Sequence, residues 1–207
     1  MIDAALIKEC ADPSLKPAII EQFVTAAGSE DPLAVTVKSG GRLILLPKAT
    51  STEEAMAIMR QYAGQAVVRV GLTQFPAGVG VTEPADLEPD LVDPCQNLRK
   101  GTTMFAKVLR IVAKWYGNPT SKDVFPQIFD DAVYAWKTGE FEGVSVFQAE
   151  DPGIPIEAPQ QSDETRPAES VDGEEATPKD VQPETMQDVR HAGIRIDLSR
   201  IGGQQQR

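Results

Sequence analysis

The spacing of apolar residues predicts that the first part of the chain is mostly helical. The strongest pattern lies in Leu15–Ala27, where apolar side chains recur every three to four residues and predict a helix that crosses the core. Ser14 is the expected N-cap of this helix, and Gly28 is the expected residue just beyond its end. Similar spacing and capping signals predict further helices over residues 2–11, 51–62, 94–116 and 121–138.

Short apolar runs between these helices predict a small sheet. Val35–Val37 and Leu43–Leu46 flank a Gly-Gly turn, which indicates a β-hairpin. Ala66–Leu72 is mostly apolar and is expected to be a buried extended segment. The sequence therefore predicts an α+β fold that is mostly helical, with a small antiparallel hairpin or sheet.

The composition changes after residue 149. Residues 150–189 hold 12 Asp and Glu against two basic residues, and they contain no aromatic residue. Such a segment cannot bury enough apolar surface to offset its chain entropy, so we expect a domain over residues 1–149 and a disordered acidic tail over 150–207. Near its end, Arg190, Arg195 and Arg200 are interleaved with apolar residues. This spacing indicates either a linear motif that folds on a partner or a frayed terminus.

The charge of the chain limits its partners. The net charge is −11, and residues 1–149 hold 14 Lys and Arg against 18 Asp and Glu. Because phosphate neutralisation by basic residues dominates nucleic-acid affinity, an acidic chain argues against nucleic acid as a main partner. No apolar run is long enough to predict a transmembrane helix, and the first residues lack a signal-peptide pattern. The cytoplasm is therefore the default expectation for location.

Histidine and cysteine are too scarce for several kinds of chemistry. His191 is the single histidine and lies in the tail, so the domain has no histidine to act as a general base or a metal ligand. Cys10 and Cys95 cannot form a zinc site on their own, and we expect no metal and no cofactor. The two cysteines are either buried free thiols or a disulfide, which would need an oxidising compartment. Hydrolytic or lyase chemistry would have to depend on carboxylates.

One face of the predicted helix that begins at Pro94 is basic. Five Lys and Arg fall within roughly 100° of arc on a helical wheel, opposite a row of apolar residues. This face indicates either a binding surface for an anionic ligand or a membrane, or a solvated face that balances the acidic remainder of the chain. The five residues are Arg99, Lys100, Lys107, Arg110 and Lys114.

Several short segments stand in the order found in one known enzyme family. They are Asp31–Val35, Gly40–Arg42, Pro47–Ala55, Val70–Gln74, Asp93–Gly101 and Trp136–Gly143. Together they resemble the lytic transglycosylases attached to type IV secretion systems, a branch of the lysozyme-like superfamily. Within that group the chain is most similar to the small TraH conjugal-transfer proteins of rhizobial plasmids. The resemblance implies a lysozyme-like domain, with conjugation or type IV secretion proteins, or peptidoglycan, as partners.

The resemblance also implies where a catalytic acid would stand. In the family a glutamate lies at the end of a helix shortly before an Asn/Asp-Pro step, and an apolar pocket raises its pKa so that it can protonate the glycosidic oxygen. The matching position here is Ala27, which has no proton to donate. Glu30 and Glu21 are the fallback acids, but both are out of register.

Other matched positions imply a glycan groove and a disulfide. The resemblance places glycan contacts at Gln74, Trp136 and Gly71, although Trp136 departs from the tyrosine of the family. Cys10 and Cys95 match a cysteine pair of the family, which favours a disulfide if the protein is exported. Family resemblance thus favours the periplasm, whereas the missing signal-peptide pattern favours the cytoplasm.

These observations leave three functions open. The first is a degenerate lysozyme-like module of conjugal plasmid transfer that binds glycan or a secretion partner without cleavage. The second is an active peptidoglycan lytic transglycosylase whose acid is displaced to Glu30 or Glu21. The third is a cytoplasmic cargo or adaptor protein that is recognised through its C-terminal motif.

Overall fold

The computed structural model describes residues 2–155, which form five α-helices, a four-stranded antiparallel sheet and a two-stranded hairpin. The helices are α1 (Ala4–Cys10), α2 (Pro17–Ala27), α3 (Thr52–Tyr62), α4 (Pro94–Trp115) and α5 (Phe125–Thr138). The first sheet has the order β2-β1-β3-β4, with β1 (Val35–Ser39), β2 (Arg42–Ile44), β3 (Val67–Val70) and β4 (Phe75–Pro76). The second pairs β5 (Glu140–Phe141) with β6 (Val144–Ser145). The predicted α+β class with a small antiparallel sheet is confirmed.

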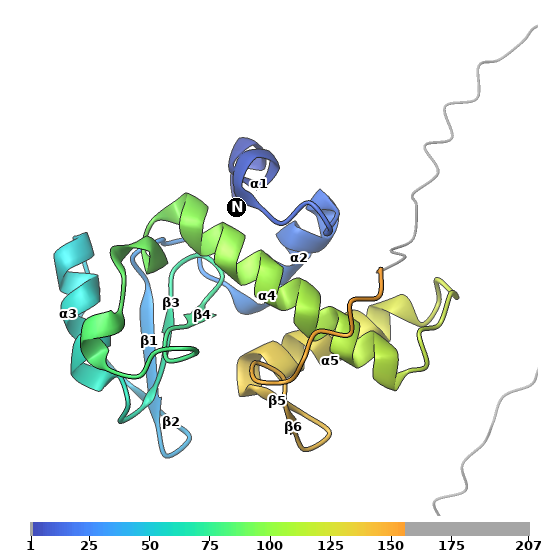
Figure 1. Cartoon of the computed structure of the whole chain (residues 1–207). Helices are drawn as coiled ribbons and strands as arrows, with labels where there is room; N and C mark the ends of the chain where they lie inside the picture. The colour runs from blue at the N-terminus through green and yellow to red at the C-terminus, as the bar shows by residue number, and fades with distance from the viewer. Residues whose placement is uncertain (1, 156–207) are drawn as a thin grey trace, which may run out of the picture. The chain divides into compact units, whose positions relative to one another are not determined.

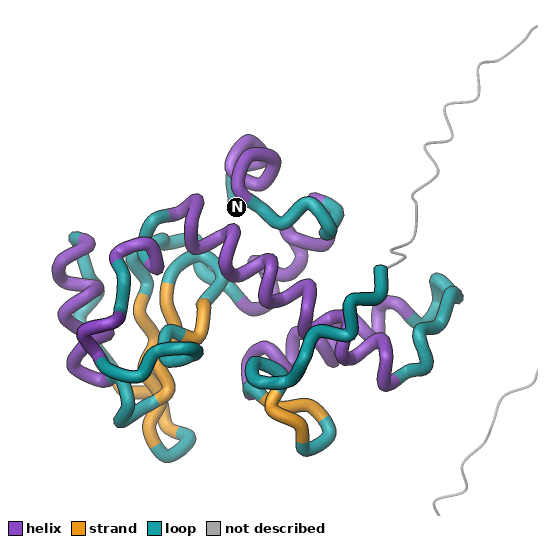
Figure 2. The backbone as a smooth tube through the Cα atoms, viewed as in Figure 1, coloured by secondary structure: helices purple, strands orange, loops and turns teal. Residues whose placement is uncertain are grey.

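The long helix α4 is the centre of the arrangement. Figure 1 shows α4 passing between the four-stranded sheet with α3 on one side and α5 with its hairpin on the other. The same division into a sheet-containing part and a helical part is visible in Figure 2. Both α1 and α5 pack against α4, and α2 packs against α1 and α5. Two one-turn 3-10 helices, Pro84–Asp86 and Pro89–Leu91, lead from the sheet into α4.

Aromatic rings from three helices meet in the core. Phe23 of α2 stacks on Phe105 of α4 with ring centroids 3.9 Å apart, and Trp136 of α5 meets Phe23 edge-on at 5.2 Å. All three side chains are fully buried. Because such rings each bury a large apolar area, this contact is a main source of stability for the helical part.

Two helices begin later than the sequence indicated. Ser14 is not the cap of α2, because the helix starts at Pro17 after an extended Lys16. A residue before proline avoids the helical region, which explains the later start. Ser121 likewise does not open α5, which starts at Phe125. Pro126 has no N–H to donate to a preceding turn, so the helix can begin only just before it.

A disulfide joins the first helix to the central one. Cys10, the last residue of α1, is bonded to Cys95 in the first turn of α4, across 85 positions of sequence. Of the two states that the sequence left open for these cysteines, the structure contains the bonded one.

Candidate functional site

The end of α2 lies against the turn between β3 and β4. Ala27 is the last residue of α2 and is half-buried. The next residue, Gly28, is extended rather than left-handed, so it does not end the helix in the way that the sequence indicated. Glycine allows the backbone here to lie close to Leu72, because a Cβ at Gly28 would lie 2.2 Å from the Leu72 carbonyl oxygen. The Ser29 N–H donates to the same oxygen at 2.9 Å.

Two of the segments that carry the family resemblance pack on each other. Gly71 has a φ of 73°, and a Cβ there would collide with the Asn97 side chain. Gly101 lies one turn further along α4, where a Cβ would lie 2.2 Å from Thr73 Oγ1. The turn Gly71–Gln74 therefore fits against the start of α4 only because both glycines lack side chains.

The Asn97 side chain makes four hydrogen bonds, two of them to Thr73 in this turn. Its Oδ1 accepts from Thr73 N and Thr73 Oγ1, at 3.0 and 2.9 Å. Its Nδ2 donates to the Val70 and Leu91 carbonyl oxygens, at 3.0 and 2.8 Å. Asn97 is fully buried, so these bonds satisfy groups that water cannot reach.

Arg69 is a buried cation that was not among the residues expected at the site. Its side chain is 7% exposed, and its guanidinium donates to the carbonyl oxygens of Trp136 at 2.6 Å, Lys137 at 3.1 Å and Gln74 at 3.2 Å. No carboxylate of residues 2–155 forms an ion pair with Arg69, and its Nε has no hydrogen-bond partner there. Burial lowers the pKa of the guanidinium to about 10, which leaves it charged at neutral pH.

The negative end of α5 takes the place of a carboxylate. Trp136 and Lys137 lie in the last turn of α5, where carbonyl oxygens have no partner within the helix and carry the negative end of its dipole. The guanidinium also lies 6.0 Å from the Trp136 ring and 5.7 Å from the Phe147 ring. The sequence signal was a single arginine within the apolar run Ala66–Leu72.

The residues expected to bind glycan are part of this framework. Trp136 is fully buried and its Nε1 donates to the Thr73 carbonyl oxygen at 3.0 Å, so its side chain presents no surface to a sugar. Gln74 is 9% exposed and donates through Nε2 to the Gly71 carbonyl oxygen at 3.1 Å. Gly71 is buried beneath Asn97. In this structure all three residues are buried, and Trp136 and Gln74 are hydrogen-bonded to the turn.

Neither fallback acid has the surroundings of a general acid. Glu21 lies on the exposed side of α2. Glu30 is also exposed, and hydrogen bonding and attraction to a positively charged group hold the pKa of its carboxyl below the usual range. A general acid at neutral pH needs the opposite shift, which burial in an apolar pocket provides.

The described part of the chain has neither a metal-binding cluster nor a membrane-spanning helix. Residues 2–155 contain no group of three or more His, Cys, Asp or Glu side chains that could hold a metal ion. None of the helices described here has the length and apolar character needed to cross a bilayer. The C-terminal motif Arg190, Arg195 and Arg200 lies outside the described residues, as does His191.

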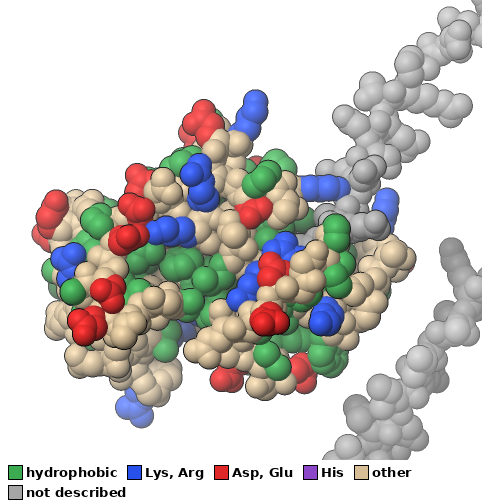
Figure 3. Space-filling view, viewed as in Figure 1, with side chains coloured by type: hydrophobic (Ala, Val, Ile, Leu, Met, Phe, Trp, Pro, Cys, Tyr) green, Lys and Arg blue, Asp and Glu red, His purple; other side chains and the backbone are tan. Residues whose placement is uncertain are grey.

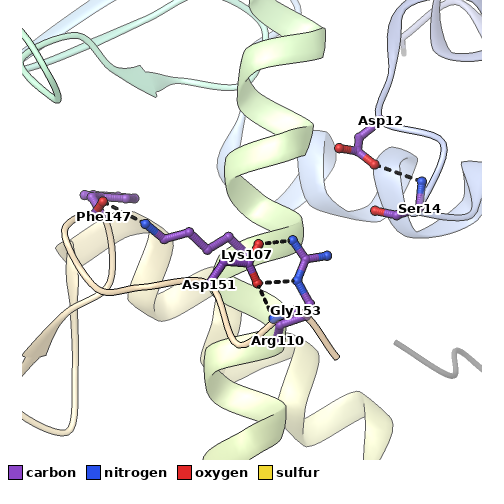
Figure 4. Close-up of polar contacts among 7 residues, drawn as sticks. All are labelled: Asp12, Ser14, Lys107, Arg110, Phe147, Asp151 and Gly153. Carbon is purple, nitrogen blue, oxygen red and sulfur yellow. Dashed lines mark hydrogen bonds and ion pairs between the residues drawn. The ribbon is translucent and has the colours of Figure 1, made fainter. Parts of the chain in front are cut away.

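Two of the five basic residues of α4 bind the chain that follows β6, and within residues 2–155 the other three do not. Lys107 donates to the Phe147 carbonyl oxygen at 2.9 Å, and Arg110 forms a two-point ion pair with Asp151, with Nε 2.7 Å from Oδ1. Figure 4 shows both bonds holding the chain after β6 against α4. Of the remaining three, Lys100 is half-buried, as Lys107 and Arg110 are, whereas Arg99 and Lys114 are exposed.

Comparison with known proteins gives one family. The family model TraH_2 matches residues 1–203. The chain is 70% identical over 203 residues to the uncharacterized protein y4dP of Sinorhizobium fredii (strain NBRC 101917 / NGR234), a match that covers 98% of this chain and 100% of that protein. No solved structure matches the chain. A match to the family model over nearly the whole length shows that this chain belongs to the TraH_2 family.

Proposed function

We propose that the protein is a non-catalytic accessory protein of conjugal plasmid transfer, built on a lysozyme-like module that binds a partner of the type IV secretion machinery. Membership of the TraH_2 family suggests a role related to conjugal transfer. The observation that carries the non-catalytic part is Ala27: the end of α2 lies beside the turn Gly71–Gln74, and its last side chain is a methyl group.

The chemistry supports this proposal. Cleavage of a glycosidic bond needs a group that protonates the leaving oxygen, and its loss costs about 10²–10⁴-fold in rate. Ala27 cannot supply that proton, and Glu30 and Glu21 are exposed to solvent. Neither is enclosed in an apolar pocket of the kind that raises a carboxyl pKa to the working range.

Burial of the expected glycan contacts favours a protein partner over glycan. Trp136 has no exposed surface, and Gln74 is hydrogen-bonded within its own turn. The Arg69 side chain joins the sheet to the end of α5 in the same region. A glycan strand would have to displace these contacts before it could bind there.

The disulfide supports a site of action outside the cytoplasm. Disulfides form and persist in oxidising compartments, and the bond between Cys10 and Cys95 agrees with the periplasmic alternative. This favours the accessory module over the cytoplasmic cargo protein. Fractionation of cells that carry the plasmid, with detection of the full chain, tests the location directly.

A peptidoglycan assay tests the non-catalytic proposal. Purified full-length protein is incubated with peptidoglycan. The products are separated by chromatography, and 1,6-anhydro-muropeptides are identified by mass spectrometry. We expect none, while an active lytic transglycosylase releases them under the same conditions. Release by the wild type that is lost in Glu30→Gln or Glu21→Gln would overturn the proposal and support a displaced acid.

Plasmid transfer tests the accessory role. Deletion of the gene is expected to lower transfer, and complementation with the wild type, Glu30→Gln or Glu21→Gln is expected to restore it equally. Normal transfer without the protein would contradict the role. A chain without residues 190–207 addresses the cargo alternative, which requires that this truncation abolish transfer.

A further inference from the structure

A hollow on the face of α4 remains outside the proposed function. It has a volume of about 440 Å³ and is lined by Phe75, Arg99, Lys100, Thr103, Met104 and Lys107, with Asp151 at its edge. Arg99, Thr103 and Lys107 follow one another at intervals of four positions, and Lys100 and Met104 lie beside them, so the α4 residues share one face of the helix. Figure 3 shows hydrophobic side chains gathered on the face that α4 crosses, with basic side chains on either side of them.

The two ends of the hollow differ in charge. At one end Asp151 is already engaged by two guanidinium nitrogens of Arg110, Nε and one Nη. At the other end Arg99 is exposed and makes no ion pair with any residue of the described part. Lys100 lies 3.4 Å from Glu88 and 3.7 Å from Asp90, both of which are largely exposed. Such surface pairs contribute little, so an incoming carboxylate can replace them.

The floor of the hollow is apolar and firmly held. Phe75 is 7% exposed and belongs to β4, directly after Gln74. Gln74 has a φ of 50° and is fixed by the Arg69 guanidinium and by its own bond to Gly71. The floor therefore needs little ordering when a ligand binds, which favours affinity.

We propose that this hollow binds an acidic peptide segment of a conjugation partner, with an apolar side chain against Phe75 and Met104 and carboxylates beside Arg99 and Lys100. The inference rests on the proposed role as a binding protein and names the surface that would carry it. Charge complementarity selects the ligand: within a chain of net charge −11, the segment from Pro94 to Lys122 contains no acidic residue.

Two other anionic ligands fit this surface less well. A nucleic acid needs a basic track along its backbone, whereas Lys100 lies beside Glu88 and Asp90. A bilayer surface needs apolar side chains that protrude, whereas Phe75 is buried and Met104 is half-buried. An acidic peptide satisfies both the shape and the charge.

Amide NMR spectra of the full-length protein test the proposal. The probe is a short synthetic peptide of glutamate and leucine, with two control peptides in which glutamine replaces glutamate or serine replaces leucine. We expect shifts at Arg99, Thr103 and Met104 with the first peptide, and weaker binding by about tenfold or more with either control. Absence of binding by the first peptide, or equal binding by all three, would overturn the proposal.

Charge-reversal variants locate the binding to this hollow. Arg99→Glu combined with Lys100→Glu is expected to weaken binding by about tenfold or more, because two attractive charges become repulsive. Lys114→Glu is the matched control on the same helix and should bind as the wild type does. Equal affinity of all three proteins would overturn the proposal, as would tighter binding of single-stranded DNA or phosphatidylglycerol vesicles at the same residues. The result is independent of whether the protein cleaves peptidoglycan, so the two proposals can fail separately.

Discussion

The Arg69 guanidinium donates to the Trp136 carbonyl oxygen at 2.6 Å, which places a buried cation at the negative end of α5. The contact spans 67 positions of sequence and connects the four-stranded sheet to the helical part. It shows how this fold tolerates a charge inside its core without a carboxylate. Three carbonyl oxygens accept hydrogen bonds from the guanidinium, and two of them lie at the end of α5.

Replacing Arg69 should therefore lower stability. Arg69→Ala leaves three carbonyl oxygens without their donor and opens a cavity, and we expect the free energy of unfolding to fall by about 3 kcal/mol. Arg69→Lys keeps the charge but loses the planar fork, so its loss should be smaller. Urea unfolding of both variants measures this. Arg60→Ala, on the exposed side of α3, is the control and should change stability by less than about 0.5 kcal/mol. Equal losses for Arg69→Ala and Arg60→Ala would contradict the role.

The spacing of apolar residues predicted the helices, because each helix buries side chains that are only three or four positions apart in the sequence. The apolar stripe of Leu15–Ala27 does pack into the core through Phe23, and the Gly-Gly turn does join β1 to β2. The helix starts were predicted less well, because Pro17 and Pro126 restrict the backbone more strongly than Ser14 and Ser121 can cap it.

The site could be predicted only in part, because its contacts are long-range. The resemblance to lytic transglycosylases led to the expectation that Ala27 stands where an acid would, and it gave no sign that Trp136 and Gln74 are buried. Burial follows from the packing of Gly71 and Gly101 against neighbours that lie 26 and 28 positions away. A single sequence has no signal for such pairs. The lone arginine in Ala66–Leu72 was the one visible clue to the buried cation.

Loss of the Asn97 amide should destabilise the turn Gly71–Gln74. Asn97→Ala removes the partners of one N–H, one hydroxyl and two carbonyl groups, all buried, and we expect a loss of about 2–4 kcal/mol in the free energy of unfolding. Asn97→Asp keeps the shape but turns an oxygen toward two carbonyl oxygens, so it should be at least as harmful at neutral pH and recover in part when acidified. Thermal unfolding followed by circular dichroism measures both.

The neighbouring residue provides the control for Asn97. The Gln96 side chain makes no hydrogen bond within residues 2–155, so Gln96→Ala should leave stability nearly unchanged. If Asn97→Ala unfolded with the same midpoint as Gln96→Ala, the network around the turn would not be a source of stability.

Reduction of the disulfide should lower the free energy of unfolding, because the unfolded chain gains conformational entropy when the bond no longer constrains it. For a loop of 85 positions, loop-closure entropy corresponds to about 4–5 kcal/mol, which is an upper limit. Urea unfolding with and without dithiothreitol measures the difference. The double variant Cys10→Ser with Cys95→Ser is the control and should match the reduced wild type and not respond to dithiothreitol. Two free thiols in protein isolated from its native cell, counted by alkylation and mass spectrometry, would contradict the bond.

The ion pair between Arg110 and Asp151 should make stability depend on pH at the acidic end. The hydrogen bond from Arg110 holds the pKa of the Asp151 carboxyl below its ordinary value of 3.8. A carboxyl whose pKa is lower in the folded state stabilises the fold above the unfolded pKa, and this contribution is lost as the pH falls through the folded pKa. Asp151→Asn should therefore be less stable than the wild type at pH 7, and the difference should shrink below about pH 4. Asp130→Asn, at an exposed position of α5, should show no such trend. The test is the unfolding midpoint of each protein measured across this pH range. A difference in midpoint between wild type and Asp151→Asn that does not change with pH would mean that the loss of stability comes from packing and not from the charge.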